Sequence, residues 1–268
     1  MNNNPVAIVT GASSGIGLVS AQALVKAGYR VFGTSRKTVA NLQGITMLIC
    51  DVMDEASVKA MIAEVVNQAG RIDLVVNNAG VGLLGGAEES SIAQAKRLFD
   101  VNVFGVARVV NAVLPTMRQQ KCGRIINMSS ILGLIPAPFN AFYAATKHAL
   151  EGYSESLDHE VRASGIRVVL VQPGVTRTSF EENLVRADQP MAIYAAERAR
   201  SETLMRKWIE SGDEPQIVAD IVVKAATAKK PKLRYSAGKL STQTRMLRRF
   251  MPERVVDKAL RKFNEFAA

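Results

Sequence analysis

The stretch Thr10-Gly-Ala-Ser-Ser-Gly-Ile-Gly17 decides the fold of this chain through its place between two elements. It follows a short apolar run at residues 6–10, typical of a buried strand, and precedes a helical pattern that extends to about Gly28. A glycine turn at such a junction lets the backbone approach a pyrophosphate, which the free N–H groups and the dipole of the helix attract. The stretch therefore predicts a dinucleotide-binding turn near the start of the chain.

Strand-like and helical patterns alternate along the chain that follows. Apolar runs occupy residues 30–34, 45–50, 72–77, 123–128 and 166–172, and helical patterns occupy residues 54–69, 91–117 and 141–164. Continuous apolar strands between amphipathic helices indicate a parallel sheet that is covered on both faces. We therefore expect an α/β fold: a single doubly wound Rossmann domain over residues 1–268. Its mostly parallel seven-stranded sheet (order 3-2-1-4-5-6-7) should carry helices on both faces.

Composition limits the classes of protein to which the chain can belong. Its 268 residues are 48% hydrophobic with a mean hydropathy of +0.07, which suits one large domain. Apolar runs such as Val101–Val113 are too short or too polar to span a bilayer, and Met1–Pro5 lacks the features of a signal peptide. We therefore expect a cytoplasmic protein. Cys50, Cys122 and the two histidines show no metal-binding spacing, so no metal site is expected.

The positive net charge of +10 is concentrated at one end of the chain. Residues 229–268 contain 12 Lys+Arg and 3 Asp+Glu, which leaves 22 and 21 for residues 1–228. Residues 239–268 predict a basic amphipathic helical extension that is broken near Pro252. The body, another subunit or lipid must cover its apolar face. We favour a docked helix with a solvated basic face, and peripheral contact with an anionic membrane is the alternative. Nucleic acid is not an expected partner, because few aromatic residues stand among these charges and no groove-reading motif appears.

Several motifs together identify a family. The glycine spacing is GxxxGxG, and the later motifs are Asp51, Asn77-Asn-Ala-Gly80, Asn102, Ser130, Tyr143-Ala-Ala-Thr-Lys147 and Pro173-Gly174. In this order and spacing the chain resembles the short-chain dehydrogenase/reductase family over almost its whole length. The stretch Leu233–Gly238, with the helix after it, resembles the hydroxysteroid- and retinol-dehydrogenase-like branch.

The resemblance implies a cofactor site along the ends of the strands. Asp51 should bond the adenine amino group beside the backbone of Val52, and Asn78, Ala79 and Gly80 should line the adenine ribose. Nicotinamide and phosphates should contact the segment after the last long strand, at Pro173, Gly174, the amide of Val175, and Thr176 or Thr178. The glycine turn should contribute Gly11, Ser13, Ser14, Gly15, Ile16 and Gly17.

The end of the second strand predicts which nicotinamide dinucleotide is bound. An NAD site needs a carboxylate there to bond the ribose 2′-hydroxyl. The sequence instead reads Ser35-Arg36-Lys37, and Arg36 offers a fork of donors suited to a 2′-phosphate. The prediction is NADP(H), although Arg36 and Lys37 could also be merely solvated cations.

The predicted chemistry is the transfer of a hydride between nicotinamide and an alcohol or ketone carbon. Tyr143 and Lys147 are four residues apart on a helix, so the ammonium should lie near the phenol and lower its pKa. The resemblance makes Tyr143 the acid/base and Lys147 both the modulator of its pKa and the anchor of the nicotinamide ribose. Ser130, chosen over Ser129 for its spacing to Tyr143, would polarise the substrate oxygen. Asn102 would hold a water in a proton relay.

The substrate should be an apolar alcohol or ketone, such as a steroid, a retinoid or a lipid carbonyl. The loops at residues 81–84 and 131–139 contain no charged side chain, and residues 177–212 predict a mobile lid. The lid carries the large apolar residues Phe180, Leu184, Met191, Tyr194, Met205 and Trp208. A homodimer or homotetramer is expected by analogy with the family. The alternative function is an NADP(H)-sensing or interaction protein that uses the same fold without turnover.

Overall fold

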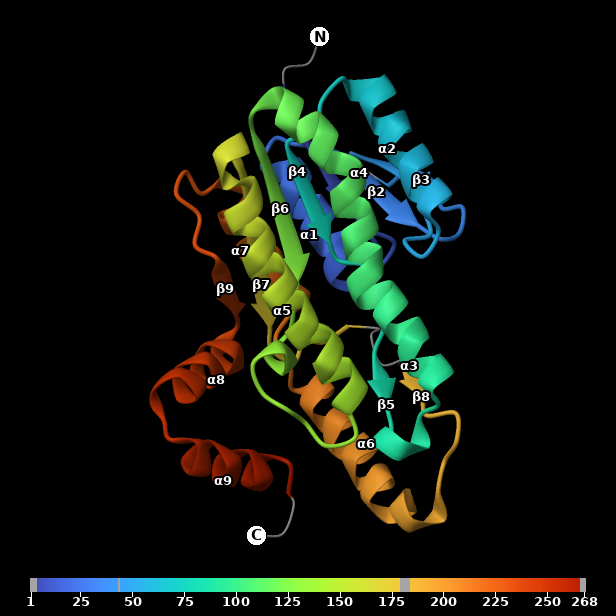
Figure 1. Ribbon diagram of the computed structural model, residues 1–268, viewed down its shortest axis with the longest axis vertical. Helices are drawn as coiled ribbons and strands as arrows, with labels where there is room; N and C mark the ends of the chain where they lie inside the picture. Colours follow the sequence, from blue (N-terminus) through green and yellow to red (C-terminus); the bar gives the residue numbers. More distant parts are fainter. Residues whose placement is uncertain (1–3, 43, 179–183, 266–268) are drawn as a thin grey trace.

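The computed structural model describes residues 4–42, 44–178 and 184–265, and it contains a seven-stranded parallel sheet between two layers of helices (Figure 1). The strand order is β3-β2-β1-β4-β6-β7-β9, which confirms the predicted fold and strand order. The strands are β1 Val6–Val9, β2 Arg30–Ser35, β3 Ile45–Ile49, β4 Leu74–Asn77, β6 Gly123–Met128, β7 Ile166–Pro173 and β9 Arg234–Ala237. A separate parallel pair, β5 Leu83–Leu84 and β8 Val185–Arg186, was not predicted.

Helices cover both faces of this sheet because each strand buries side chains on both sides. The helices are α1 Gly15–Lys26, α2 Glu55–Ala69, α3 Ile92–Phe99, α4 Gly105–Gln120, α5 Ala141–Val161, α6 Ala195–Glu210, α7 Pro215–Thr227, α8 Lys239–Phe250 and α9 Glu253–Phe263. Helices α2, α4 and α5 share one hydrophobic cluster with the sheet, and α1 and α7 share the other. The core is therefore two apolar layers separated by the strands.

One predicted helix is divided by a π-helical turn. The pattern at residues 91–117 predicts a single helix, but the structure has α3, a π-helical turn at Asp100–Phe104, and α4. The stretch Ile92–Gln120 is long and apolar enough to cross a membrane by length and composition, since an 18-residue window within it has a mean hydropathy of 1.4. The apolar runs were expected to be too short or too polar to span a bilayer, and by length and composition this stretch is not. However, α4 packs Val109, Val110 and Val113 into the core at 0% exposure, as a core helix does.

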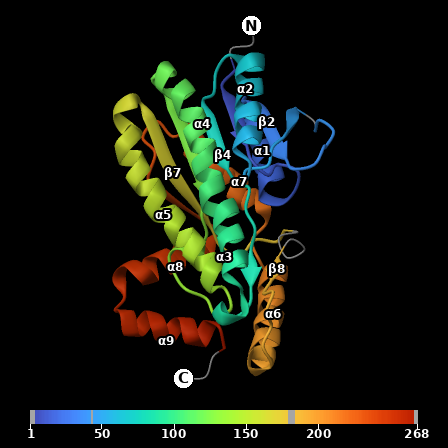
Figure 2. The same cartoon turned by 45° about the vertical axis from the view of Figure 1, so that its right-hand side comes forward.

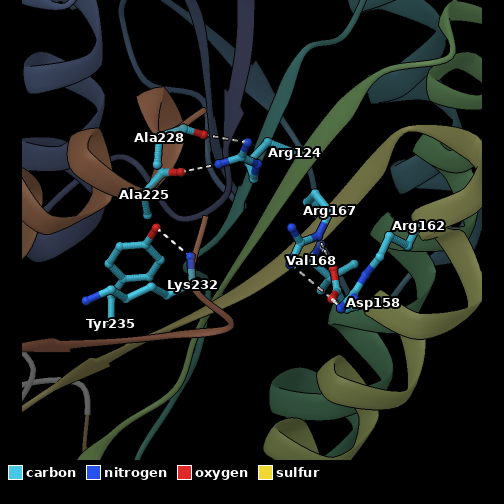
Figure 3. Close-up of polar contacts among 9 residues, drawn as sticks. All are labelled: Arg124, Asp158, Arg162, Arg167, Val168, Ala225, Ala228, Lys232 and Tyr235. Atoms are coloured by element: carbon cyan, nitrogen blue, oxygen red, sulfur yellow. Dashed lines mark hydrogen bonds and ion pairs between the residues drawn. The ribbon is translucent and has the colours of Figure 1, made fainter. Parts of the chain in front are cut away.

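Two half-buried arginines, Arg124 and Arg167, and the buried carboxylate of Asp158 tie helices to the sheet at the end away from the glycine turn (Figure 3). Arg124 on β6 donates to the carbonyls of Ala225 and Ala228 at the C-terminal end of α7, where a cation also favours the helix dipole. Asp158 on α5 forms ion pairs with Arg162 and Arg167, and it accepts a hydrogen bond from the Val168 amide of β7 at 2.9 Å. These contacts fix α5 and α7 against opposite faces of the sheet.

Candidate active site

A cavity of about 560 Å³ lies at the carboxyl ends of the strands and brings almost all predicted site residues together. From the predicted cofactor set it is lined by Gly11, Ser13, Ser14, Gly15, Ile16, Gly17, Ser35, Arg36, Asp51, Val52, Asn78, Ala79, Gly80, Pro173, Gly174, Val175, Thr176 and Thr178. Ser130, Tyr143 and Lys147 line the same cavity, whereas Asn102 does not. These residues come from seven separate segments of the chain, which meet at the carboxyl ends of the parallel strands.

The glycine turn is shaped to admit a ligand against its backbone. Gly11 and Gly15 have φ angles of +66° and +54°, in the left-handed region that favours glycine. A Cβ atom on Gly17 would lie 2.2 Å from the Gly11 carbonyl oxygen, so only glycine fits there. Ser14, the N-cap of α1, makes no side-chain capping hydrogen bond. The first N–H groups of α1 are thus available for an anion, and the turn fits a dinucleotide phosphate.

Asn78 holds this turn in place. Its Nδ2 donates to the Thr10 carbonyl at 3.0 Å and to the Gly11 carbonyl at 3.1 Å. Its main-chain N–H donates to Thr10 Oγ1 at 3.0 Å. The resemblance predicts that Asn78 lines the adenine ribose; in the structure its side chain also fixes the phosphate turn, because both amide hydrogens have protein partners.

The adenosine end of the cavity combines a fixed carboxylate with exposed cations. Asp51 Oδ1 accepts a hydrogen bond from the Met53 amide at 2.9 Å, and the Asp51 amide donates to Ser57 Oγ at 3.0 Å. Arg36 and Lys37 are exposed at the rim of the cavity, directly after the end of β2. The Lys37 amide donates to Ser35 Oγ at 3.3 Å, so the loop turns tightly at Ser35. A phosphate at this rim would meet two cations and no acid from this loop.

Three of the four predicted catalytic side chains meet in the cavity. Tyr143 and Lys147 lie one turn apart on α5, with Lys147 Nζ 5.6 Å from the centroid of the Tyr143 ring. Ser130 forms a hydrogen bond with the Tyr143 hydroxyl and caps the short 3₁₀ turn at residues 131–133. Ser129 Oγ, by contrast, is buried without a hydrogen-bond partner among the described residues. The geometry therefore pairs Tyr143 with Ser130 rather than with its neighbour.

Burial dominates the proton affinities of this pair. Desolvation raises the pKa of Tyr143 to about 12, although the hydrogen bond with Ser130 acts to lower it. Desolvation also lowers the pKa of Lys147 to about 8, against the charge of Glu151. The expectation of a lowered Tyr143 pKa is thus wrong. Lys147 Nζ donates to the Met128 carbonyl at 2.8 Å and lies beside the ring, and its charge does not offset the desolvation of the phenol.

Asn102 lies outside the cavity wall, in the π-helical turn between α3 and α4. Its side chain accepts from the Val81 amide at 3.0 Å and donates to the Val81 carbonyl at 2.9 Å and to Thr146 Oγ1 at 3.2 Å. The side chain therefore joins the loop after β4 to α5. Thr146 directly precedes Lys147, so this contact helps to set the position of the lysine.

A buried polar network behind Lys147 could not be predicted from the motifs. Glu151, one turn further along α5, accepts hydrogen bonds from Gln172 Nε2 of β7 at 2.9 Å and from Arg234 Nε of β9 at 2.7 Å. Arg234 also pairs with Glu155 at 2.7 Å. Only the i, i+4 spacing of Lys147 and Glu151 could have indicated it. The network gives the buried Glu151 carboxylate an amide and a guanidinium as hydrogen-bond donors, one helical turn beyond the lysine.

The substrate end of the cavity has apolar walls from three directions. The loop at residues 131–138 and the helix α6, with Leu204, Met205 and Trp208, form two of them. The third wall is the end of α9: the Phe263 ring stacks on Trp208 with centroids 4.6 Å apart, and Asn264 also lines the cavity. Sequence reasoning predicted a docked C-terminal helix but not its place in this wall. Leu184, Met205 and Trp208 line the cavity as expected, Met191 and Tyr194 do not, and Phe180 lies outside the described residues.

Comparison with known proteins gives the family of this chain. The family model described as short chain dehydrogenase matches residues 5–189. The chain is 36% identical over 261 residues to a 3-ketodihydrosphingosine reductase from Bacteroides thetaiotaomicron, covering 96% of this chain and 97% of that protein. It is 35% identical over 251 residues to retinol dehydrogenase 8 from Bos taurus, covering 85% and 79%.

Solved structures show the same fold around nicotinamide cofactors. A short-chain dehydrogenase from Streptomyces avermitilis matches with a TM-score of 0.82 and 31% identity, over 99% of this chain and 96% of that one. A short-chain dehydrogenase/reductase from Burkholderia phymatum in complex with NAD matches with a TM-score of 0.80 and 25% identity, over 92% and 93%. ElxO with NADP bound matches with a TM-score of 0.73 and 26% identity, over 89% and 99%. Structural relatives thus bind either dinucleotide.

Proposed function

Because the chain belongs to the short-chain dehydrogenase family of oxidoreductases, we propose that it transfers a hydride between NADP(H) and an alcohol or ketone carbon of an apolar substrate. The observation that carries this proposal is the meeting of Ser130, Tyr143 and Lys147 in the cavity that also holds the glycine turn. A nicotinamide bound there supplies or accepts the hydride. The protein must supply the proton and hold the substrate oxygen.

Tyr143 is the proposed proton donor to the oxygen of the carbonyl that is reduced. Its raised pKa keeps the phenol protonated at neutral pH, so a proton is present when the alkoxide develops. Ser130, bonded to the same hydroxyl, would donate to the substrate oxygen and stabilise its developing negative charge. The Lys147 ammonium, held by the Met128 carbonyl, would use its remaining donors on the ribose hydroxyls of the cofactor.

The proton that leaves Tyr143 must be replaced from solvent. The Asn102 side chain is occupied by Val81 and Thr146, so we assign the proposed water of the relay to its main-chain carbonyl. The π-helical turn supports this assignment, since such turns alter the regular carbonyl ladder and occur often at functional sites.

NADP(H) is the proposed cofactor because the loop after β2 carries Arg36 and Lys37 and no acid. A carboxylate at Ser35 would repel the 2′-phosphate, whereas the serine hydroxyl already accepts the Lys37 amide and adds no charge.

An apolar alcohol or ketone is the proposed substrate. The walls around Tyr143 are the loop at residues 131–138, α6 and the end of α9, and the side chains that they give to the cavity are without formal charge. The similar 3-ketodihydrosphingosine reductase and retinol dehydrogenase are named for long apolar molecules, which agrees with such walls. A homodimer or homotetramer and a cytoplasmic location stay proposals, the first by analogy with the family.

Replacing Tyr143 by Phe tests the proposed function. We expect Tyr143→Phe to lower kcat by about 10²–10⁴-fold, since a positioned acid contributes that much. NADPH binding, measured by fluorescence titration, should be unchanged because the glycine turn is intact. Tyr153→Phe on the same helix, outside the cavity lining, is the control and should keep its turnover. NADPH binding without oxidation across a wide panel of ketones by the unaltered protein would instead favour a sensing role.

A further inference from the structure

The turn between α8 and α9 presents large apolar side chains to solvent. Phe250 is 64% exposed and Met246 is 55% exposed, and Met251 and Val255 are exposed beside them in the sequence. Figures 1 and 2 show α8 and α9 as an arm whose turn projects from the rest of the molecule. We call these four residues, together with the exposed cations Arg248, Arg249, Arg254, Lys258 and Lys262, the elbow surface.

Exposed cations surround these apolar side chains. Arg248, Arg249, Arg254, Lys258 and Lys262 are exposed, and none forms a salt bridge with a residue that the structure describes. The Arg249 guanidinium lies 5.4 Å from the centroid of the Phe250 ring. A cation and an exposed aromatic side chain are therefore direct neighbours on this surface. The excess charge of residues 229–268 is therefore displayed at the surface.

The opposite side of the arm is docked at the rim of the cavity. Val256 is 2% exposed, Asn264 is buried, and Phe263 stacks on Trp208 of α6. On α8, Ser241 donates to the Gln172 carbonyl of β7 at 2.6 Å. These contacts hold both helices on the body and leave the elbow surface facing outward.

We propose that the elbow surface binds the surface of an anionic lipid bilayer. Exposed aromatic and aliphatic side chains next to arginine and lysine match the interface of such a bilayer, where apolar groups enter the acyl boundary and cations meet the lipid headgroups. A second copy of the chain fits less well, because a symmetric contact would place two strongly basic surfaces against each other.

The inference also concerns how the substrate arrives, and this part rests on the proposed function. Phe263 and Asn264 belong both to the docked arm and to the cavity wall. The exposed cations of the elbow surface continue along α9 to Lys262, the residue before Phe263, so a bilayer held along this face lies near the substrate end of the cavity. An apolar alcohol or ketone dissolved in the bilayer would reach Tyr143 without crossing much water.

Sedimentation with vesicles tests the binding step without any turnover. The full chain should co-sediment with vesicles of phosphatidylcholine containing about one third phosphatidylserine, and not with phosphatidylcholine alone. High salt should weaken the binding. The double variant Arg248→Glu, Arg249→Glu should bind about tenfold more weakly or worse, and the neutral pair Arg248→Gln, Arg249→Gln should show an intermediate loss. Phe250→Ser should bind several-fold more weakly.

Matched controls separate this surface from general charge and hydrophobicity. Lys229→Glu with Lys230→Glu makes the same charge change in the loop before β9, at the other end of that strand from α8. Ile92→Ser removes an equally exposed apolar side chain from α3. Both controls should bind like the unaltered chain. The inference is overturned if the controls lose as much vesicle binding as the elbow variants do. It is also overturned if the unaltered chain stays in the supernatant with anionic vesicles. A Phe250→Ser variant that alters only self-association in analytical ultracentrifugation overturns it too.

Turnover measurements separate a failure of this inference from a failure of the proposed function. On a long-chain ketone held in anionic vesicles, Phe250→Ser should raise the apparent KM several-fold, whereas on a short water-soluble ketone it should leave kcat and KM unchanged. Equal kinetics on both substrates would overturn the delivery role while the hydride transfer stands. Vesicle binding without turnover of either ketone by the unaltered chain would reject the enzymatic role instead.

Discussion

Tyr143 holds its proton more tightly than a tyrosine in water does, and Lys147 holds its proton less tightly than a free lysine. Both shifts have the same cause, since burial disfavours the phenolate in one case and the ammonium in the other. Side-chain partners then act against burial: Ser130 on the phenol and Glu151 on the ammonium. Single residues behind the catalytic pair can therefore tune its pH dependence.

Replacing Glu151 by Gln should shift the pH profile. The charge of Glu151 raises the pKa of Lys147, so without it that pKa should fall further below about 8. The limb of the kcat profile that reports Lys147 should move to lower pH by about one unit. Glu155→Gln is the control, because Glu155 pairs with the same Arg234 and is more exposed. A profile that moves equally in both variants would assign the effect to Arg234 rather than to Lys147.

Replacing Ser35 by Asp should move cofactor preference toward NAD. The new carboxylate would stand where the ribose 2′-hydroxyl of NAD is bonded, and it would repel a 2′-phosphate. We expect the ratio of kcat/KM for NADPH to that for NADH to fall by about 10²-fold or more. Thr38→Asp, a few residues further into the exposed loop, is the control. An unchanged ratio in Ser35→Asp would contradict the NADP(H) assignment.

At the scale of elements, one buried carboxylate fastens the segment over the cavity. Glu89 is fully buried and accepts from the Gly86 amide and the Met191 amide, each at 2.8 Å, and it forms an ion pair with Arg198 of α6. Its burial acts to raise its pKa, but these donors outweigh burial and the pKa lies below the ordinary value. The predicted lid is therefore attached to the body at a defined point, and its mobility stays a prediction.

Glu89→Gln should loosen this segment. The amide nitrogen of Gln would face a backbone N–H, and the ion pair with Arg198 would be lost, at a cost of about 2–3 kcal/mol. Limited proteolysis should cut residues 184–212 faster, and the KM for a bulky apolar ketone should rise. Glu88→Gln is the control, since Glu88 is exposed and its hydrogen-bond partner among the described residues is the Tyr194 hydroxyl. Unchanged proteolysis of Glu89→Gln would show that the apolar contacts of α6 hold the segment alone.

At the scale of the whole molecule, the contacts in Figure 3 join helices to the sheet far from the site. Asp158 has a carboxylate that is 1% exposed and that meets two arginines and an amide of β7. Burial acts to raise its pKa, but the hydrogen bonds from Arg167 and Arg162 outweigh burial and hold the pKa below its ordinary value. The group therefore stabilises the fold above the ordinary carboxylate pKa, and this contribution is lost as the pH falls through its folded pKa.

Asp158→Asn should lower the free energy of unfolding at pH 7 by about 3 kcal/mol, since it breaks a buried ion-pair cluster. The difference from the unaltered chain in urea unfolding should shrink as the pH falls below about 4. Asp220→Asn, on the exposed side of α7, should change stability little at either pH. A difference that grows at low pH would reverse the sign that the shifted pKa requires.

The sequence by itself determined the sheet, its strand order, the glycine turn and the residues that line the cofactor end of the cavity. The strands, the helices and the glycine turn depend on local periodicity and on motifs with fixed spacing, which short windows of sequence contain. The strand order follows from the alternation of strands and helices along the whole chain, which predicts a doubly wound sheet. The helix from Ala141 and the position of Tyr143 four residues before Lys147 are of this kind. The break of the C-terminal helix near Pro252 is another, because proline cannot continue a helix.

Only the tertiary structure decided which charges and apolar faces meet. Glu151 with Arg234, Glu89 with Arg198, and Phe263 with Trp208 are contacts between residues far apart in the sequence. No local pattern encodes such pairs, since they depend on how separate elements are packed. The pKa of Tyr143 belongs here too: spacing placed a cation one turn away, but burial, which is a property of the whole fold, determined the direction of the shift.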